Sequence, residues 1–260
     1  MKNDTIIIIV VFLVLSAFVL SDSKNIFLGK IIEKDYDGFI VLDKYGEIYV
    51  AGAAEYLGDL GLSQDVVRDI EIVDGGYYIL DKFGKIFVFG NAEFYGEASL
   101  NNAVDLELRD EGYYILDSNG LVHDYGIAQL YGKGEFSDYV DMELSETGYY
   151  LLNKDGKVEV FGDAIHVGDK KVDDAVDLEV ANGGYYILEE SGKINFFGDV
   201  KDLGFEILEE GFAKDLELIP GGEGYYVLDD FGNTHSYQAS VGLYGPEITG
   251  ERKYIDLELL

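Results

Sequence analysis

Two carboxylates alternate with two apolar side chains in a short segment that occurs six times in this sequence. The segment reads D-[ILM]-E-[ILV], and its first residues are Asp69, Asp105, Asp141, Asp177, Asp215 and Asp256. Successive side chains of a β-strand point to opposite faces, so the Asp and the Glu share one face and the apolar pair shares the other. Six such strands around one axis would bring twelve carboxylates together.

Carboxylates held that close together bind protons more tightly or recruit cations. The pattern therefore predicts a cation or ordered-water site lined by the six aspartates, with Ca²⁺ as the candidate ion and no other cofactor. In the structural alternative, each aspartate hydrogen-bonds the backbone of a neighbouring turn and keeps the repeats in register. If the segments were outermost strands, their acids would simply be solvated.

The three histidines argue against a catalytic metal. His123 and His235 occupy the same position in the third and sixth repeats, on opposite sides of a six-membered ring, and His166 lies in a different strand. The sequence has no zinc-ligand spacing, calcium-loop pattern, nucleophile elbow or phosphate loop. Covalent catalysis therefore has no candidate residue. A pair of carboxylates that cleaves glycosides stays open, because any two of 51 acids could face each other.

A repeat positions these segments. Each copy follows the pattern G-Y-Y-I-L-D-x-x-G-x-I-x-x-F-G-x-A-x-x-Y-G, then a variable stretch, then D-L-E-L. The copies open at Gly38, Gly76, Gly112, Gly148, Gly184 and Gly224, at steps of 38, 36, 36, 36 and 40 residues. A fixed period in this range is typical of propellers, solenoids and arrays.

Four short strands are expected in each copy, as the second copy illustrates. Residues 76–80 and 85–89 are rich in β-formers, and residues 81–84 between them form a tight turn with Asp first and Gly last. Residues 93–95 are expected to form a short third strand and residues 105–108 a fourth. Nothing has a sustained helical period. Four strands and four turns in 36 residues suit one propeller blade.

The phase of the repeat predicts closure of the ring. The last D-L-E-L segment, residues 256–259, has no tyrosine pair after it, and the first copy has no good D-L-E-L before it. Both absences are explained if the C-terminal strand pairs with the first blade. This pairing leaves no unpaired sheet edge where the two ends of the ring meet. Residues 31–34 partly match the segment and compete for that place. The expected fold is an all-β, six-bladed β-propeller over residues 35–260.

Over residues 35–260 the chain resembles the tyrosine-rich repeat of exported bacterial β-propellers, of the broad WD40-like or YVTN-like kind. The units that carry the resemblance are D-[IL]-E-L, G-Y-Y-[VI]-L-D-x-x-G and F-G-x-A. It implies that the D-L-E-L strand is innermost, beside the central channel, and it implies no shared activity. The first and sixth copies depart most, with Phe39 and Ile40 in place of the tyrosine pair and Gln238 in place of the glycine found at Gly90.

The N-terminus has the order of a secretory signal peptide. Residues 1–4 are polar, residues 5–20 are almost all apolar, and small residues follow around Ser21. The apolar run is short for a spanning helix, so cleavage after Ser21 is favoured over an uncleaved anchor, with residues 22–34 as a linker. The sequence has no cysteine, which excludes a lipoprotein anchor and disulfides. The expected location is secreted, periplasmic or at the cell surface.

The formal net charge is −32, from 51 acidic and 19 basic residues, and 48% of the residues are hydrophobic. The apolar content is enough for a folded core. A strong negative field repels phosphate backbones and anionic lipid headgroups, so nucleic-acid and membrane-surface binding are not expected. Cationic partners, metal ions and neutral ligands remain. The alternative reading of the charge is solubility alone.

Three further features of the repeat allow weaker inferences about packing and ligand binding. The tyrosine pairs indicate core packing, with a platform for a stacked ligand as the alternative. The third position after each turn glycine varies freely, which suggests an exposed or ligand-facing site; it holds Tyr49, Phe87, His123, Glu159, Asn195 and His235. Loops on a rigid scaffold usually carry binding, and the variable stretches are expected to form one face of the ring; they are residues 58–67, 96–104, 132–140, 168–176, 204–214 and 245–255.

The function that these observations favour is non-catalytic. We expect a monomeric binding or scaffolding module at the cell envelope that engages a protein or a glycan through one loop face. Two alternatives stay open: a carboxylate-based hydrolase or lyase that acts on polysaccharide, and a purely structural component of the envelope. Fold alone does not decide between them.

Overall fold

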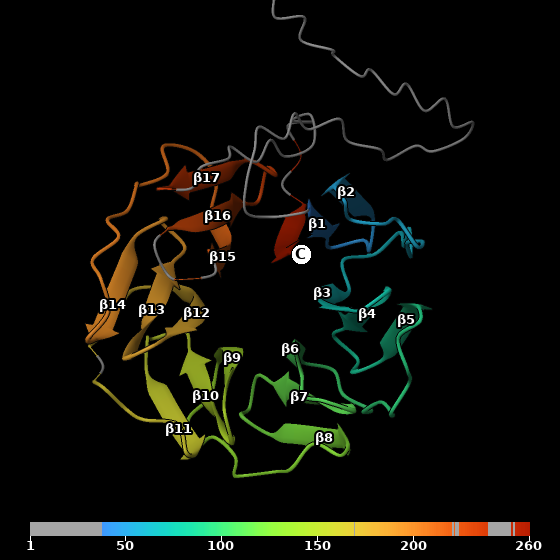
Figure 1. Cartoon of the computed structure of the whole chain (residues 1–260), viewed down its shortest axis with the longest axis horizontal. Helices are drawn as coiled ribbons and strands as arrows, with labels where there is room; N and C mark the ends of the chain where they lie inside the picture. Colours follow the sequence, from blue (N-terminus) through green and yellow to red (C-terminus); the bar gives the residue numbers. More distant parts are fainter. Residues whose placement is uncertain (1–37, 169, 220, 222–223, 239–250, 252) are drawn as a thin grey trace, which may run out of the picture.

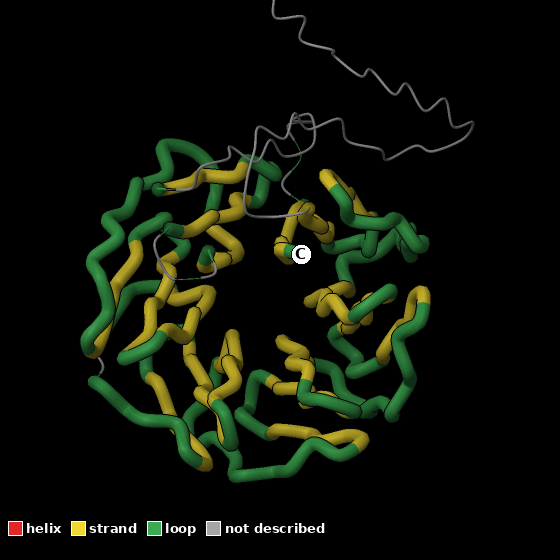
Figure 2. Tube along the Cα trace, in the orientation of Figure 1, coloured by secondary structure: helices red, strands yellow, loops and turns green. Residues whose placement is uncertain are grey.

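The structure, a computed structural model, describes residues 38–168, 170–219, 221, 224–238, 251 and 253–260. These residues contain eighteen β-strands joined by turns and loops (Figure 2). No helix long and apolar enough to cross a lipid bilayer occurs in this part of the chain. The predicted signal peptide and linker, and the competing segment at residues 31–34, lie outside the described residues.

The strands form six antiparallel sheets of three strands, arranged as the blades of a ring (Figure 1). In each blade the strands are given from the centre outward. Blade 1 comprises β18 (Tyr254–Leu259), β1 (Gly38–Asp43) and β2 (Ile48–Gly52), blade 2 comprises β3 (Val67–Val73), β4 (Gly76–Asp81) and β5 (Ile86–Gly90), and blade 3 comprises β6 (Ala103–Leu108), β7 (Gly112–Asp117) and β8 (Val122–Gly126). Blade 4 comprises β9 (Tyr139–Ser145), β10 (Gly148–Asn153) and β11 (Val158–Gly162), blade 5 comprises β12 (Ala175–Ala181), β13 (Gly184–Glu189) and β14 (Ile194–Gly198), and blade 6 comprises β15 (Ala213–Leu218), β16 (Tyr225–Asp229) and β17 (Thr234–Tyr237).

Blade 1 takes its inner strand from the far end of the chain. β18 pairs antiparallel with β1, with Leu259 opposite Phe39 and Leu257 opposite Val41. The same strand contacts β15 of blade 6 and β3 of blade 2. The last D-L-E-L segment thus occupies in blade 1 the place that β3 and β6 occupy in blades 2 and 3.

The prediction of a fourth strand in each blade was wrong. Residues 93–95 form no strand, because tyrosine hydroxyls satisfy their backbone instead of a neighbouring strand. Tyr78 Oη donates to Glu93 O at 2.9 Å and accepts from Glu93 N at 3.0 Å. Tyr113 Oη of the next blade accepts from Gly96 N at 2.9 Å. The segment is therefore fixed as an irregular loop along the outside of the blade.

The tyrosine pairs pack in the core, as predicted, and each pair reaches both neighbouring blades. Tyr113 and Tyr149 are fully buried. The ring of Tyr78 meets the ring of Tyr113 edge-on at 5.4 Å, and the rings of Tyr114 and Tyr149 repeat this geometry at 5.6 Å. Such contacts add to the burial of the rings. Apolar clusters between adjacent blades, built around these rings, make up the core.

One acid builds the turn between the middle and outer strands. Asp81 Oδ1 accepts hydrogen bonds from Phe83 N at 2.9 Å and Lys85 N at 3.0 Å. Gly84 follows in the left-handed conformation, with φ of +78°. Side-chain oxygens at the first turn position stabilise turns in this way. The predicted turn is therefore confirmed.

The variable loops run across the same side of the ring as these turns. Ala98 N donates to Gly84 O at 3.0 Å, and Leu208 N donates to Ser191 O at 3.0 Å. We call this side the loop face. The turns between inner and middle strands lie on the opposite side. Each inner strand therefore starts at the loop face, with its aspartate nearer that face than its glutamate.

Candidate functional site

Twelve carboxylates line a channel on the axis of the ring, which we call the acidic channel. They are the acids of the six D-L-E-L segments, and they enclose a volume of about 250 Å³ together with Leu216. The acids are Asp69, Glu71, Asp105, Glu107, Asp141, Glu143, Asp177, Glu179, Asp215, Glu217, Asp256 and Glu258. The structure thus brings all six predicted aspartates together on the innermost strands.

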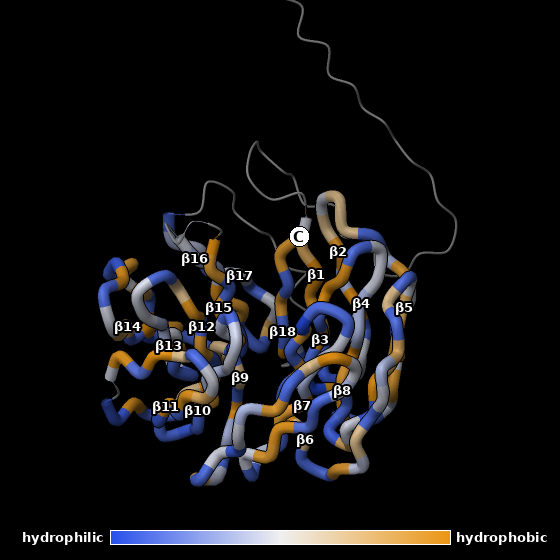
Figure 3. Tube along the Cα trace, turned by 60° about the horizontal axis from the view of Figure 1, so that its bottom comes forward, coloured by the Kyte–Doolittle hydropathy of each residue, from blue (hydrophilic) through white to orange (hydrophobic). Residues whose placement is uncertain are grey.

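A β-bulge precedes the aspartate in every inner strand. In β6 the pairing with β7 shifts between Ala103 and Asp105, so that Val104 is the extra residue. The same irregularity occurs in the other five inner strands. A bulge bends its strand and redirects the side chains beside it. Beyond the bulge, hydrophilic and hydrophobic residues alternate along the inner strands (Figure 3), so the acids face the channel while the apolar residues pack between blades.

Four of the aspartates hydrogen-bond the next inner strand around the ring. Each accepts from the amide of the residue that follows the aspartate of that strand. Hydrogen bonds of this kind hold adjacent blades in register, as in the structural alternative, except that the donor belongs to an inner strand and not to a turn. The four are Ile70 N to Asp256 Oδ2 (2.7 Å), Leu106 N to Asp69 Oδ2 (2.7 Å), Leu178 N to Asp141 Oδ2 (2.8 Å) and Leu216 N to Asp177 Oδ2 (3.1 Å).

Asp105 and Asp215 differ from these four. The Oδ2 atom of each is buried and has no hydrogen-bond partner. Asp105 as a whole is 9% exposed. The two residues belong to blades 3 and 6, which lie opposite each other in the ring (Figure 1). Two carboxylate oxygens in opposed blades are therefore buried without a hydrogen-bond partner.

Burial raises the pKa of the channel carboxyls. For Asp141 burial raises the pKa to about 7, although amide hydrogen bonds from Leu178 and Met142 oppose the shift. For Glu179 burial raises the pKa to about 8, against a hydrogen bond from Leu218 N. Burial and then repulsion from neighbouring carboxylates raise the pKa of Asp105 well above its ordinary value. Low polarity and like charges both favour the protonated form.

The lining of the channel includes no basic side chain in the described part of the chain. Over the same residues, no three His, Cys, Asp or Glu side chains are grouped so that they could hold one metal ion directly. The channel can therefore accept protons, water or hydrated cations from solution.

In blades 3, 5 and 6 the variable position after the turn faces the acid of its own turn. His235 Nε2 lies 3.0 Å from Asp229 Oδ2, and Asn195 Nδ2 donates to Glu189 Oε1 at 2.8 Å. Asn195 is only 2% exposed, so the expectation of an exposed site was wrong there. His123 is half-buried in the equivalent place. These contacts explain polar residues at this position without a ligand.

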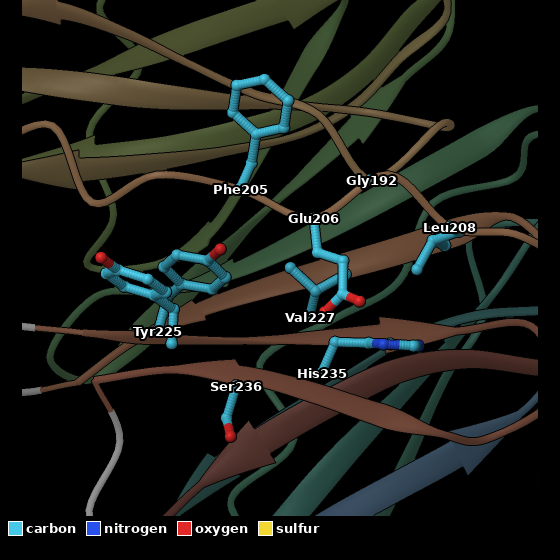
Figure 4. Close-up of a pocket in the computed structure, with 9 residues that line it drawn as sticks. Gly192, Phe205, Glu206, Leu208, Tyr225, Val227, His235 and Ser236 are labelled. Atoms are coloured by element: carbon cyan, nitrogen blue, oxygen red, sulfur yellow. The ribbon is translucent and has the colours of Figure 1, made fainter.

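A second cavity, the interblade pocket, lies between blades 5 and 6 beside the loop face (Figure 4). Its volume is about 300 Å³. The rings of Tyr225 and Tyr237 stack at 5.9 Å in its wall, and Figure 4 shows Glu206 and His235 beside them. Its lining comprises Gly192, Phe205, Glu206, Leu208, Tyr225, Val227, His235, Ser236 and Tyr237. The sequence analysis did not predict this pocket.

The pocket exists because the loop over it packs less closely than the equivalent loops. Tyr225 Oη donates to Gly204 O at 3.2 Å, whereas the matching bond from Tyr149 Oη to Gly132 O is 2.6 Å. The loop of residues 204–214 is also two residues longer than its counterpart between blades 3 and 4. The length of that loop, compared across repeats, is the sequence signal that could have indicated the pocket.

Several apolar side chains on the variable loops are exposed, and one of them, Phe205, lines the interblade pocket. Phe205, Ile207 and Phe212 all lie on the loop of residues 204–214 and are between 40% and 52% exposed. Phe136, on the loop between blades 3 and 4, is 50% exposed. The loop face therefore combines a concave aromatic pocket with exposed apolar side chains on its loops.

Comparison with known proteins identifies the fold class. No family model and no curated protein matches the sequence. Among solved structures, the chain is similar to the computationally designed Ika8 protein, with a TM-score of 0.54 and 11% identity over 82% of this chain and 84% of that chain. It is also similar to the C-terminal WD40 domain of Sif2, with a TM-score of 0.51 and 12% identity over 77% of this chain and 63% of that chain. These likenesses show a WD40-like β-propeller fold.

Proposed function

We propose that this protein is a non-catalytic binding or scaffolding module that engages a partner protein through its loop face. The observation that carries this proposal is the interblade pocket, with the exposed Phe205 in its lining and the exposed Ile207 and Phe212 on the same loop. Protein interfaces typically centre on a few side chains that fill such pockets, surrounded by a water-excluding rim. The pocket volume of about 300 Å³ is enough for a large anchoring side chain.

The negative charge of the chain bears on the charge of the partner that it can bind. The net charge is −32, and Glu206 lines the pocket itself. Complementary charge speeds encounter and excludes wrong partners. The partner surface is therefore basic, with an aromatic, aliphatic or cationic side chain as the anchor that enters the pocket.

Two paired variants test the loop face. In Phe205→Ser/Ile207→Ser the apolar rim is removed, and we expect at least a tenfold loss of affinity for a partner identified by affinity purification and mass spectrometry, about 1.4 kcal/mol. The control is Phe94→Ser/Ile165→Ser, which removes two exposed apolar side chains from the loops that follow β5 and β11. Equal losses in the two variants, measured by titration calorimetry, would contradict docking at the interblade pocket.

A glycan is the alternative occupant of the same pocket. Stacked tyrosines offer an apolar face, and Glu206 and His235 offer hydrogen-bonding groups beside it. A panel of polysaccharides in a melting-temperature assay separates the two ligand classes, because a ligand at 100 times its Kd stabilises by about 2.7 kcal/mol. A shift with one glycan that Tyr237→Ala abolishes would assign the pocket to carbohydrate.

A carboxylate-based hydrolase or lyase acting on polysaccharide is the second candidate function. The raised pKa values of Asp141 and Glu179 favour it, since carboxyls that stay protonated near neutral pH act as general acids. The acidic channel is nevertheless smaller than the ~300–1,000 Å³ of usual ligand pockets. Product release from polysaccharide by the wild type, but not by Asp141→Asn/Glu179→Gln, would establish the enzyme.

We further propose that the protein is exported as a monomer and acts outside the cytoplasm, secreted, periplasmic or at the cell surface. The apolar run of residues 5–20, which follows a short polar segment, supports export. N-terminal sequencing of the mature protein should give Asp22; an intact Met1 would indicate a membrane anchor instead. Concentration-dependent filaments would favour the purely structural role.

We also propose that the pairing of β18 with β1 closes the ring and is required for its stability. The support is the register that places Leu257 opposite Val41 and the contacts of β18 with β15 and β3. Closure leaves no unpaired inner edge in blade 1.

A further inference from the structure

The outer strand of each of blades 2 to 6 carries an aromatic ring that packs on the first tyrosine of the middle strand, with ring centres 5.1–5.9 Å apart. In blade 4 a loop glycine covers this ring so closely that a Cβ added at Gly132 would overlap Phe161. In blade 6 a Cβ added at the equivalent Gly204 would lie 3.6 Å from Tyr237. The loop is therefore farther from Tyr237, which is 41% exposed and borders the interblade pocket.

Blade 5 shows how the chain itself fills the equivalent space. A Cβ added at Gly168 would meet no atom within 4 Å, so this loop too lies away from the ring of Phe197. The ammonium of Lys170 lies 6.0 Å from the centre of that ring. Lys170 is the second residue after the loop glycine, and Glu206 holds the same position after Gly204. A lysine thus lies over the ring in blade 5, whereas blade 6 has an acid at the matching position and an open pocket.

The interblade pocket has the groups that hold an ammonium. The face of an aromatic ring attracts a cation, and three rings line the pocket, those of Phe205, Tyr225 and Tyr237. Figure 4 shows the carboxylate of Glu206 among them. No lysine or arginine of the described residues lines the pocket, and the imidazole of His235 is directed at the buried Asp229, with Nε2 3.0 Å from Oδ2. The negative charge of Glu206 is therefore available to a cation from outside.

We propose that the anchor of the partner protein is a lysine side chain, held in the interblade pocket beside the aromatic rings and the Glu206 carboxylate. This inference rests on the proposed docking of a protein at the loop face and specifies the chemistry of its anchor. The four-carbon stem packs along the rings while the ammonium meets the carboxylate. Lys170 is the intramolecular example of the same contact. The net charge of −32 favours the approach of a lysine-rich surface.

Two peptides test the ammonium directly. The mature protein, residues 22–260, is titrated at pH 7.5 with acetyl-Gly-Lys-Gly-amide and with acetyl-Gly-norleucine-Gly-amide, and the amide NMR signals of residues 235–237 are followed. Norleucine keeps the four-carbon stem and lacks the charge. The lysine peptide should shift these signals saturably, and the norleucine peptide should bind at least tenfold more weakly. Equal affinities, or no saturable shift with the lysine peptide, would overturn the proposal.

A charge reversal at the matching position supplies the second test. Glu206→Lys recreates the arrangement of blade 5, so the new side chain should occupy the pocket and weaken the lysine peptide at least tenfold. The matched control is Glu97→Lys, which makes the same change of charge at an exposed acid on the loop between blades 2 and 3. We expect less than a threefold loss in this control. Equal losses would overturn the proposal, because only the summed charge would matter; melting curves confirm that both variants fold.

The partner-binding assay separates this inference from the proposed function. Loss of partner affinity in both Phe205→Ser/Ile207→Ser and Glu206→Lys would support docking and the lysine anchor together. Loss in the first variant alone would leave docking intact and overturn the lysine anchor. Unchanged affinity in both variants would overturn docking at the pocket, and the anchor with it.

Discussion

At the scale of single residues, the tyrosine hydroxyls explain why three strands per blade are enough. The first tyrosine of each pair reaches the loop of the preceding blade, and the second reaches the loop of its own blade. Tyr149 Oη donates to Gly132 O at 2.6 Å, and Tyr114 Oη donates to Gln129 O at 2.8 Å. A buried ring with a polar tip thus replaces an outer strand and joins adjacent blades at the same time.

The substitution Tyr113→Phe tests this role. It leaves the buried ring in place but removes the acceptor of Gly96 N and Tyr95 N, which lie at 2.9 and 3.2 Å. We expect a loss of about 1–3 kcal/mol in the free energy of unfolding, because buried amides lose their partner. Urea denaturation measures it. Tyr45→Phe, which loses only an exposed contact, should change stability by less than about 0.5 kcal/mol.

At the scale of elements, the inner strand does two tasks with one alternating pattern. Its apolar residues, such as Leu106 and Leu178, are buried between blades, and its acids border the channel. In four blades the bulge before the aspartate turns the carboxylate toward the next inner strand, where it accepts an amide proton. The same four residues therefore build the core and align the ring.

β18 should contribute as much as any other inner strand if it closes the ring. Leu257 is fully buried in β18, whereas Leu260, three residues later, is 43% exposed. Leu257→Ala should lower the free energy of unfolding by about 2–5 kcal/mol, as expected for a large-to-small change in a core. Leu260→Ala should change it by less than about 0.5 kcal/mol. If the two variants had the same urea midpoint, β18 would not be packed against blade 1.

At the scale of the whole molecule, the most prominent property is the negative charge. The chain carries a net charge of −32, and twelve of its acids converge on one axis. The amide hydrogen bonds of four aspartates offset part of the resulting repulsion, and proton uptake offsets more of it. The stability of the fold is therefore expected to depend on pH.

We expect stability to fall as the pH rises from about 5 to about 8. The pKa of Asp141 is raised from its ordinary value of 3.8 to about 7 and that of Glu179 from 4.5 to about 8. In this window the folded protein binds more protons than the unfolded chain, so stability decreases with increasing pH. Asp141 alone accounts for roughly 2–3 kcal/mol, at about 1.4 kcal/mol per pH unit.

Melting temperatures between pH 5 and pH 8 in low salt with EDTA measure this dependence. Asp141→Asn should flatten the profile, since the asparagine does not titrate. A melting temperature that rises toward pH 8 would show that the channel carboxyls are not protonated in the fold. The pKa values of Asp163 and Asp229 are lowered, so these two groups make stability increase with pH. They do so only below about pH 4, outside this window.

The sequence by itself determined the repeat, the six blades, the turn acids and the convergence of the D-L-E-L acids. These are properties of periodicity and of side-chain alternation, which act over a few residues and repeat six times. The tyrosine pairs were also predictable as core residues, because a β-strand exposes both of its faces to neighbouring blades.

Only the tertiary structure decided which polar groups find partners. Residues 93–95 look like a strand locally, but hydroxyls from two blades satisfy their backbone. Asp105 and Asp177 both lie in the segment Ala-Val-Asp-Leu-Glu, yet Asp177 Oδ2 accepts a proton from the Leu216 amide and Asp105 Oδ2 has no hydrogen-bond partner, because that bond depends on the relative placement of adjacent blades. The interblade pocket likewise depends on how closely the loop of residues 204–214 packs against Tyr225, and no local pattern encodes that distance.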